Sequence, residues 1–406
     1  MDEHTILTSA AADRGFEGAW YVPRVKRVLL TGATGLVGGA LLPRLLAVDP
    51  AVTVWCLLRA ADATVLEQRR ARLLVDAGVT PEDHDRVLAV AGDVGAPALG
   101  IAYPDALAAQ IDTIVHTAAS TRFDLSLDAA RRINVGSVEN IIEFARLAQQ
   151  HGKFDRVHHV STAYVAGDHA GVIGSPPTEP LGPFRNTYEQ SKWEAEEVLR
   201  AAGDSVPFTI SRPSIIVGDS VTGATPHFRV LYEPMKWVYF SNHSDGGAPS
   251  KLTDVLPVRP AIRLDVVPVD FVADTIVALL SCDDAIGEVF HITAGPDHAL
   301  TIEETVDVVL ATTNDYLAEV GRPPMTRPRL ISPEMLEADP DLRETFELAE
   351  SVMSLYMPYG LREQTFNADA TLEVLGDARR ECPHPRDYYA KIVRYATEAN
   401  YGRPTA

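Results

Sequence analysis

The sequence predicts an α/β protein, with a doubly wound parallel sheet of the Rossmann type followed by a smaller, mixed and mostly helical C-terminal part. Short apolar runs alternate with helical periodicity in the first half of the chain, a glycine-rich turn follows the first run, and the alternation ends after Gly218. Such alternation implies a parallel sheet covered on both faces. The 406 residues suffice for one extended α/β domain or two closely joined domains.

The first predicted unit is a strand, a turn and a helix. The apolar run Val28-Leu-Leu30 is typical of a buried strand, the turn Thr31-Gly-Ala-Thr-Gly-Leu-Val-Gly-Gly39 follows it, and residues 36–47 have helical spacing. The same alternation then continues along the chain. Strands are predicted at 52–58, 87–91, 113–116, 157–161 and 208–211, and helices at 69–77, 134–150 and 188–202.

Three parts are expected along the chain. Residues 1–25 lack a clear periodicity and are predicted to form an N-terminal arm, residues 26–218 the dinucleotide-binding domain, and residues 219–406 the substrate-binding part. Within the last part, residues 264–295 are expected to return to the Rossmann core through a proline-started helix at 267–280 and a strand at 289–293. The aromatic segment 228–240 is interpreted as a core helix in preference to a pocket lining.

Composition narrows the class of partner and the compartment. The formal net charge of −20 disfavours nucleic acid and anionic membrane surfaces as partners. No apolar run reaches the roughly 18 residues of a membrane span, and the N-terminus lacks the regions of a signal peptide. Cys56, Cys282 and Cys382 are far apart, so neither a disulfide framework nor a zinc site is indicated, and a cytoplasmic location is expected. No His, Cys and carboxylate cluster has the spacing of metal ligands, so no metal is expected.

The glycine-rich turn predicts a dinucleotide site. Gly32, Gly35 and Gly38 lie between a predicted buried strand and a helix, where free amides and the helix N-terminus favour a pyrophosphate. A side chain at these positions would hold the phosphates away from the backbone. The alternative is a purely structural turn, because a glycine pattern by itself is a weak signal.

Arg59 favours NADP(H) over NAD(H). NAD sites usually place an acid against the ribose 2′-hydroxyl about 20 residues after the turn, whereas arginine accommodates a 2′-phosphate. The second predicted strand ends in Cys56-Leu-Leu-Arg59, without an acid. The alternative is that Arg59 is an exposed arginine that pairs with Asp62.

The segment Tyr188-Glu-Gln-Ser-Lys192 predicts a proton-transfer site. A phenol exchanges protons near neutral pH only if its anion is stabilised, and a cation four residues along a helix lies on the same face. Ser161 and Thr162 precede this pair at the end of a predicted strand. Either hydroxyl could hold a substrate oxygen, because alternation places the two on opposite faces of the strand. In this order, with the glycine turn, the motifs indicate a hydride-transfer site.

These motifs resemble the extended form of the short-chain dehydrogenase/reductase superfamily, whose glycine spacing is also G-x-x-G-x-x-G. The resemblance implies that Thr162, preferred to Ser161 for its spacing to Gly167, holds the substrate oxygen. It further implies that Tyr188 passes the proton, and that Lys192 lowers the pKa of Tyr188 and binds the nicotinamide ribose. Asn134 matches a family asparagine, although a helix cap is an equally good interpretation. The implied cofactor contacts are Thr31, Gly32, Thr34, Gly35, Leu36, Val37, Gly38, Arg59, Asp93, Val94, Thr117, Ala118, Ala119, Tyr188, Lys192, Pro213, Ser214 and Ile215.

Several longer stretches narrow the resemblance to the fatty acyl-CoA reductase and thioester reductase group, which includes the terminal domains of carboxylic acid reductases. These stretches are WCLLRA, GDVGAPALGI, DTIVHTAAS, INVGSVENIIEFA, YEQSKWEAEEVLR, ISRPSIIVGDSVTG and LDVVPVDFVADTI. The resemblance implies an NADP(H)-dependent reduction of an acyl thioester to an aldehyde and, with a second hydride, to an alcohol.

The size of the chain limits how such a thioester would arrive. A chain of 406 residues leaves no room for adenylation and carrier domains, so we expect the thioester as a CoA ester or on a separate carrier protein. The alternative is a dehydrogenase or epimerase that acts on a secondary alcohol, a ketone or a nucleotide sugar. The sequence does not determine the oligomeric state.

Overall fold

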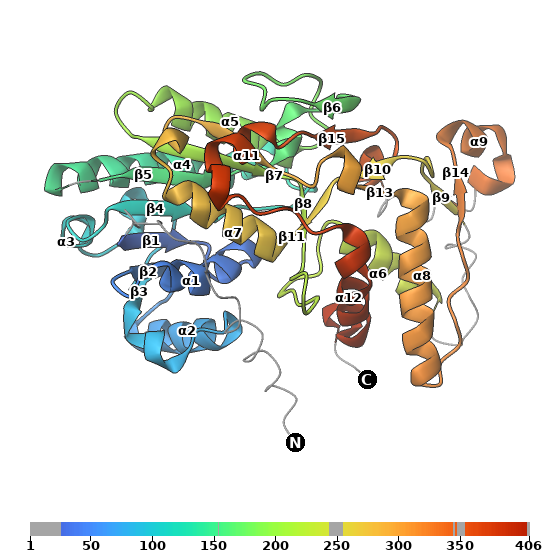
Figure 1. The fold of residues 1–406 in the computed structure, drawn as a ribbon, viewed down its shortest axis with the longest axis horizontal. Coiled ribbons are helices and arrows are strands. Elements are labelled where there is room, and N and C mark those ends of the chain that lie inside the picture. Colours follow the sequence, from blue (N-terminus) through green and yellow to red (C-terminus); the bar gives the residue numbers. More distant parts are fainter. Residues whose placement is uncertain (1–25, 153, 243–254, 344–345, 347–353, 404–406) are drawn as a thin grey trace.

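The computed structural model describes residues 26–152, 154–242, 255–343, 346 and 354–403 (Figure 1). The predicted N-terminal arm, residues 1–25, lies outside the described residues.

The central sheet has seven strands, and every neighbouring pair in it is parallel. Its order is β12-β7-β5-β4-β1-β2-β3, so the chain runs outward from β1 in one direction and then in the other. This order is that of a doubly wound sheet, as the sequence predicts, and ligands bind such sheets where the direction reverses. The strands are β1 (Arg27–Thr31), β2 (Thr53–Leu58), β3 (Val87–Ala91), β4 (Thr113–His116), β5 (Arg156–Val160), β7 (Phe208–Pro213) and β12 (Val289–Ile292).

Helices cover both faces of this sheet (Figure 1). One apolar core lies between the sheet and α1, α2, α7 and α11, and a second lies between the sheet and α3, α4 and α5. The helices are α1 (Leu36–Val48), α2 (Ala63–Asp76), α3 (Pro104–Ala108), α4 (Leu127–His151), α5 (Thr187–Ala201), α7 (Val269–Leu280) and α11 (Asp369–Leu375). Burial on both faces explains why β1 and β2 are nearly continuous apolar runs.

Two helices begin earlier than their apolar periodicity predicts. The Asp62 carboxylate accepts a hydrogen bond from the Val65 amide at 2.9 Å, and α2 therefore starts at Ala63. Ser126 caps α4 in the same way. Asn134 consequently lies inside α4, and the interpretation of Asn134 as a helix cap is wrong. The first turn of α2 contains no buried residue and that of α4 buries only Ala130, so neither turn adds a large buried side chain to the apolar spacing by which a helix is recognised.

The C-terminal part is built around a third apolar core that contains much of α6 (Tyr232–Asn242). The interpretation of the aromatic segment as a core helix is thus confirmed. Helices α8 and α12 pack against each other beside it (Figure 1). The helices of this part are α6, α8 (Ile302–Glu319), α9 (Pro333–Ala338) and α12 (Pro385–Glu398). The strands outside the central sheet are β6 (Gly171–Ile173), β8 (Ile215–Val217), β9 (Val255–Pro257), β10 (Arg263–Leu264), β11 (Val266–Pro268), β13 (Leu300–Thr301), β14 (Arg329–Ile331) and β15 (Gln364–Phe366).

Short strands connect the two parts. β6, which follows β5 in the chain, pairs with β15, and β8 pairs in parallel with β11. Residues 266–268 are therefore a strand and not the start of the predicted helix, which begins at Val269 after the proline. Strand β12 then pairs with β7, which confirms the predicted return to the sheet. Single-turn 3-10 segments make further connections, namely η2 (Pro81–Arg86), η3 (Pro97–Gly100), η4 (Ala163–Ala166), η6 (Asp283–Ala285), η7 (Pro296–His298), η8 (Met357–Gly360), η9 (Gly376–Ala378) and η10 (Asn400–Gly402).

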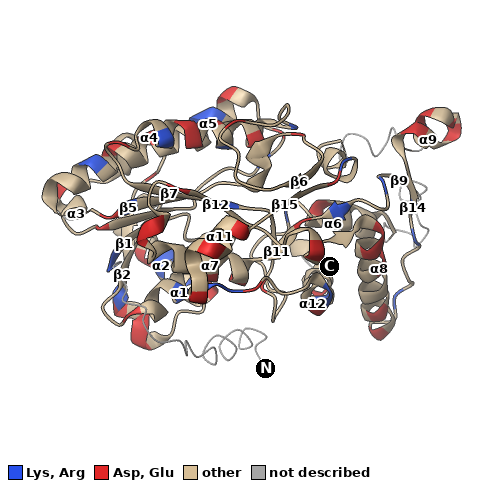
Figure 2. Ribbon diagram, turned by 45° about the horizontal axis from the view of Figure 1, so that its top comes forward, with Lys and Arg blue, Asp and Glu red and all other residues tan. Residues whose placement is uncertain are grey.

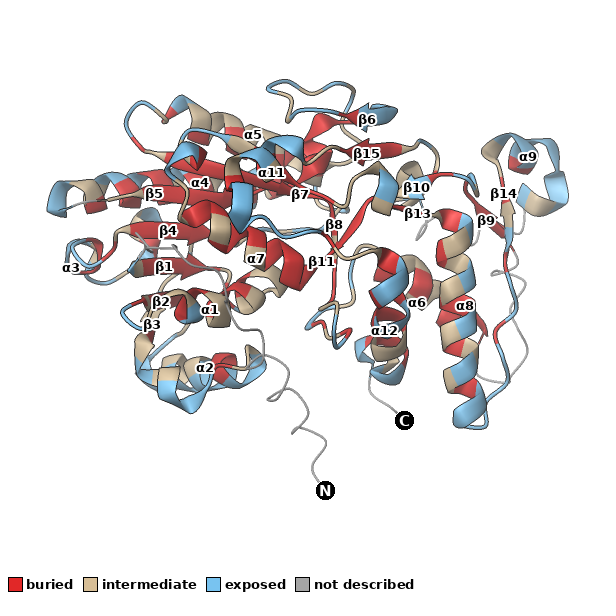
Figure 3. Cartoon of the chain, viewed as in Figure 1, coloured by how far each residue is buried: buried red, intermediate tan, exposed pale blue. Residues whose placement is uncertain are grey.

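Burial and charge follow this layered plan. The strands of the central sheet and the inner faces of the helices are buried, whereas the outer helix faces are exposed (Figure 3). Acidic residues lie on α7, α8, α9 and α12, so the negative charge is distributed over both parts of the molecule (Figure 2).

Candidate active site

The site lies at the carboxyl edge of the central sheet. Thr31 ends β1, Thr117 follows β4, Thr162 follows β5, and Pro213 ends β7. Parallel pairing brings these strand ends together: the Thr117 hydroxyl donates to the Thr31 carbonyl at 2.8 Å, and the Thr162 hydroxyl donates to the Pro213 carbonyl at 3.4 Å. Residues that are up to 182 positions apart in the sequence thus share one edge.

The glycine turn connects β1 to α1 at this edge. Gly32 has a φ of +73°, and a Cβ there would lie 2.5 Å from the Thr117 hydroxyl oxygen, whereas a Cβ on Gly38 would lie 2.2 Å from the Gly32 carbonyl oxygen. Both positions therefore require glycine for packing. Gly35 precedes α1, and no side chain caps this helix. Amides of the first helical turn are therefore available as donors for an anion, which fits the pyrophosphate of a dinucleotide.

The other predicted cofactor residues lie along the same edge. Thr34 is exposed, and Leu36 and Val37 are partly exposed at the start of α1. Arg59 is exposed directly after β2 and has no ion-pair partner among the described residues. Its proposed pairing with Asp62 is not found, because that carboxylate caps α2.

Asp93 and Val94 stabilise the turn that follows β3. The Asp93 carboxylate accepts a hydrogen bond from the Gly95 amide at 2.9 Å, and the Val94 carbonyl accepts one from the Asn140 side chain at 2.8 Å. Asp93 therefore stabilises a strand-end turn while it remains exposed. Ala118, Ala119, Ser214 and Ile215 follow the ends of β4 and β7.

The predicted catalytic residues meet at this edge. Tyr188 is the second residue of α5, and Lys192 lies one turn further along the same helix. The Thr162 hydroxyl is in hydrogen-bonding contact with the Tyr188 phenol. The Ser161 hydroxyl is buried and has no hydrogen-bond partner among the described residues. This geometry favours Thr162 over Ser161 as the neighbour of Tyr188.

Burial has the largest effect on the pKa values of both Tyr188 and Lys192. It raises the pKa of Tyr188 above the usual value, the Glu189 carboxylate acts in the same direction, and the Thr162 hydroxyl partly opposes them. It also lowers the pKa of Lys192 to about 8, against the effect of Glu196. The lowering of the Tyr188 pKa by Lys192, implied by the resemblance, is not produced by the protein's own groups. The Lys192 ammonium instead contacts the Val160 carbonyl at 2.8 Å and His159 Nε2 at 3.0 Å.

A buried polar cluster beside Tyr188 was not foreseen from the sequence. The Tyr359 hydroxyl donates to the Glu189 carboxylate at 2.6 Å, and Arg185 pairs with the same carboxylate at 3.3 Å. The Arg185 guanidinium also lies 5.1 Å from the centre of the Tyr359 ring. The i,i+4 spacing of Arg185 and Glu189 is visible in the sequence, but Tyr359 comes from η8, far along the chain.

Phe123 and Asn134 complete the surroundings of α5. The Phe123 ring stacks on Tyr188 with a centroid distance of 5.7 Å and an interplanar angle of 29°. The Asn134 amide bridges the Ser120 backbone and, at 2.9 Å, the Ser191 hydroxyl. Asn134 thus holds the segment after β4 against α5.

Neither a metal-binding cluster nor a membrane-spanning helix is found in the described part of the chain. No group of three or more His, Cys, Asp or Glu side chains within them could hold a metal ion. None of the helices in the described part of the chain is long and apolar enough to cross a membrane.

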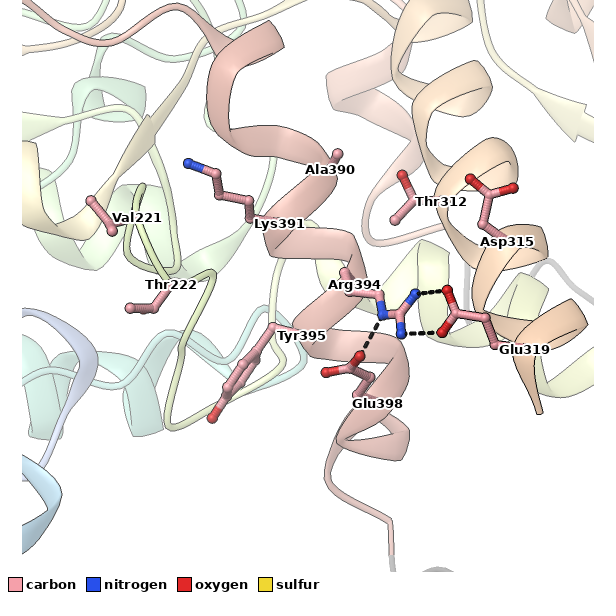
Figure 4. A pocket seen from close by; sticks show the side chains of 10 residues that line it. All are labelled: Val221, Thr222, Thr312, Asp315, Glu319, Ala390, Lys391, Arg394, Tyr395 and Glu398. Carbon is pink, nitrogen blue, oxygen red and sulfur yellow. Dashed lines mark hydrogen bonds and ion pairs between the residues drawn. The ribbon is translucent and has the colours of Figure 1, made fainter. Parts of the chain in front are cut away.

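A surface groove of about 490 Å³ lies between α8, α12 and the loop at 221–222 (Figure 4). Arg394 in this groove pairs with Glu319 and Glu398, as Figure 4 shows. None of the predicted site residues lines the groove.

The fold and the site together define a class of protein. A doubly wound sheet with this glycine turn, and with Tyr188 and Lys192 on a helix at the same edge, is that of a nicotinamide-dependent oxidoreductase of the extended short-chain dehydrogenase/reductase group. Residues 30–276 match the family model described as male sterility protein, an NAD-binding family. The chain belongs to this family.

Individual relatives agree with this assignment. The nonribosomal peptide synthetase asaC from Aspergillus flavus is 29% identical over 329 residues, which are 78% of this chain and 29% of that protein. The putative fatty acyl-CoA reductase CG8306 from Drosophila melanogaster is 26% identical over 340 residues, covering 72% of this chain and 63% of that protein. The chain therefore spans less than two thirds of either relative. The crystal structure of the terminal R domain from the myxalamid PKS-NRPS pathway superposes with a TM-score of 0.70 at 25% identity, covering 92% of this chain and 90% of that one.

Proposed function

We propose that the chain is an NADPH-dependent reductase that transfers hydride to the carbonyl carbon of an acyl thioester and releases an aldehyde. The contact between the Thr162 hydroxyl and the Tyr188 phenol, at the sheet edge that carries the glycine turn, is the observation on which this proposal rests. We further propose that residues 26–218 hold the cofactor and residues 219–406 contact the acyl group.

The cofactor contacts follow from the donors at the sheet edge. The amides around Gly35 would hold the pyrophosphate, and Arg59 would hold the 2′-phosphate. When bound, NADPH supplies the hydride. Lys192 would donate a hydrogen bond to the nicotinamide ribose. The positive charge of the oxidised ring would add to the lysine charge and favour the Tyr188 anion that burial alone disfavours.

The protein's own residues would handle the oxygen and the proton. As hydride adds to the carbonyl carbon, the oxygen gains charge, the Thr162 hydroxyl donates a hydrogen bond to it, and Tyr188 gives it a proton. The hemithioacetal then collapses: its hydroxyl returns the proton to Tyr188, the C–S bond breaks, and the sulfur leaves as a thiol after taking a proton. The sum is acyl thioester, NADPH and one proton to aldehyde, thiol and NADP⁺. A second hydride would give the alcohol.

The thioester carrier is proposed from the relatives. A nonribosomal peptide synthetase and a PKS-NRPS terminal domain are among the similar proteins, and a putative fatty acyl-CoA reductase is another. We therefore propose a CoA thioester or an acyl group on a separate carrier protein as the substrate.

A substrate panel tests the proposal. The purified protein is mixed with NADPH and, separately, with acyl-CoAs, acyl-pantetheines, ketones and nucleotide sugars, while the absorbance of NADPH and the product mass are followed. We expect NADPH oxidation and aldehyde with at least one thioester. Reduction of ketones, or conversion of nucleotide sugars, with every thioester inert would show that the enzyme is a dehydrogenase or epimerase instead.

A further inference from the structure

The buried ammonium of Lys192 contacts a histidine side chain, His159. Lys192 is 2% exposed and His159 is 1% exposed, and the ammonium lies 3.0 Å from His159 Nε2. The ammonium donates a second hydrogen bond to the Val160 carbonyl at 2.8 Å. Strand β5 therefore supplies both contacts, one from a side chain and one from its backbone. An ammonium has three N–H donors, so one donor remains for a ligand.

The direction of the hydrogen bond fixes the tautomer of His159. A charged lysine can only donate, so Nε2 accepts and the ring proton lies on Nδ1. Burial lowers the pKa of His159 well below the usual value, and the Lys192 charge adds to this effect, so the ring is neutral. His159 Nδ1 is itself buried and has no hydrogen-bond partner among the described residues. Within this part of the chain, the hydrogen bond to Lys192 is thus the one that the His159 ring makes.

A second histidine, His116, packs against the His159 ring. His116 stacks on His159 with a centroid distance of 5.3 Å and an interplanar angle of 26°. His116 is fixed at both nitrogens, by the Thr31 hydroxyl at 2.8 Å and the Ser137 hydroxyl at 3.2 Å. The two rings therefore form a rigid connection between the end of β1, where the glycine turn begins, and the catalytic lysine.

The titratable groups around Lys192 come from four elements, α5, β4, β5 and β7. Glu196 on α5 raises the pKa of Lys192, while Arg212 on β7 pairs with Glu196 at 2.7 Å and Arg200 pairs with it at 3.1 Å. His116 on β4 and His158 on β5 are neutral, because burial lowers the pKa of each to about 3. Among the described residues, His159 is the one whose side chain accepts a hydrogen bond from Lys192.

We propose that His159 is a positioning residue for Lys192: it accepts one N–H bond of the ammonium, keeps the lysine charged within the core, and leaves one donor free for the nicotinamide ribose. This inference rests on the proposed role of Lys192 in binding the cofactor. Without an acceptor at this position, burial would disfavour the ammonium further, and the lysine would lose its proton at a lower pH.

The pH dependence of NADPH binding tests this role. NADPH fluorescence is titrated between about pH 6 and pH 10 with the wild-type protein and with His159→Leu, His159→Gln and His158→Leu. Lys192 must be protonated to donate, so binding should weaken in the wild type as pH rises through about 8. In His159→Leu this loss of NADPH binding should occur about one pH unit lower, because the charged lysine loses one hydrogen bond. His159→Gln, which retains an acceptor, should show a pH dependence close to that of the wild type.

His158→Leu is the matched control. His158 is as buried as His159, lies next to it on β5 and also loses one hydrogen bond, to the Ser211 hydroxyl at 2.9 Å, but it does not contact Lys192. In His158→Leu, NADPH binding should weaken at the same pH as in the wild type. If His159→Leu does not fold, His159→Asn, whose side chain is shorter, replaces it with the same expected shift. An unchanged pH dependence in His159→Leu, or in His159→Asn where it replaces it, would overturn the inference. Undiminished binding and turnover in Lys192→Met would instead overturn the proposed role of Lys192.

Discussion

The contact between Tyr359 and Glu189 should contribute measurably to stability, because it joins the C-terminal part to the catalytic helix. The Tyr359 hydroxyl donates to the Glu189 carboxylate at 2.6 Å and accepts from the Asn186 amide at 2.8 Å. The Glu189 side chain is 0% exposed. A hydrogen bond to a buried charged group contributes about 1.5–3 kcal/mol. We expect Tyr359→Phe to lower the free energy of unfolding by about 2 kcal/mol.

Urea unfolding followed by circular dichroism provides the measurement, and Tyr356→Phe provides the control. Tyr356 also contacts the Phe123 ring, with centroids 5.6 Å apart, but its hydroxyl has no hydrogen-bond partner among the described residues. Its loss should change stability by less than about 0.5 kcal/mol. In a double-mutant cycle, Tyr359→Phe and Glu189→Gln should be coupled by at least about 1 kcal/mol. Additive effects, or equal effects of the two tyrosine changes, would refute the reasoning.

Three further changes test the cofactor site and the catalytic site. Arg59→Ala should weaken NADPH binding at least about tenfold and NADH binding much less, as fluorescence titration would show, because only NADPH carries the 2′-phosphate; equal losses would refute the NADPH assignment. Gly38→Ala should abolish NADPH binding, because the added Cβ would lie 2.2 Å from the Gly32 carbonyl oxygen and displace the turn, whereas Gly39→Ala, with its nearest contact at 3.5 Å, should bind normally. Thr162→Ala should lower kcat by about 100-fold or more and Ser161→Ala by less than about tenfold, and the reverse order would identify Ser161 as the donor.

The central sheet could be predicted because its signals are local. β1 and β2 are short apolar runs, and the glycine turn marks where β1 ends, so a parallel sheet follows from the alternation of strands and helices. The residues at which helices begin were predicted less accurately. The first turns of α2 and α4 add almost no buried side chains to the helical pattern, and the caps Asp62 and Ser126 mark where these helices begin. The apolar spacing therefore placed Asn134 at a helix start.

The contacts around the site were harder to predict, because they join residues that are distant in the sequence. Tyr359 reaches Glu189 across 170 positions, and β15 pairs with β6 across a similar distance. The sequence contains no periodic signal for such pairs. His158 and His159 are adjacent in the sequence, and only the structure separates His158, which contacts the Ser211 hydroxyl, from His159, which contacts the Lys192 ammonium.

Transfer of a labelled hydride tests the central claim most directly. NADPH carrying two deuterium atoms at C4 is incubated with the acyl thioesters and the protein, so that transfer from either face of the ring delivers deuterium, and the aldehyde is analysed by mass spectrometry. The wild type should produce an aldehyde with one deuterium, and Tyr188→Phe should bind NADPH with unchanged affinity but form at least about 100-fold less product. An unlabelled aldehyde, or full turnover by Tyr188→Phe, would contradict hydride transfer assisted by Tyr188.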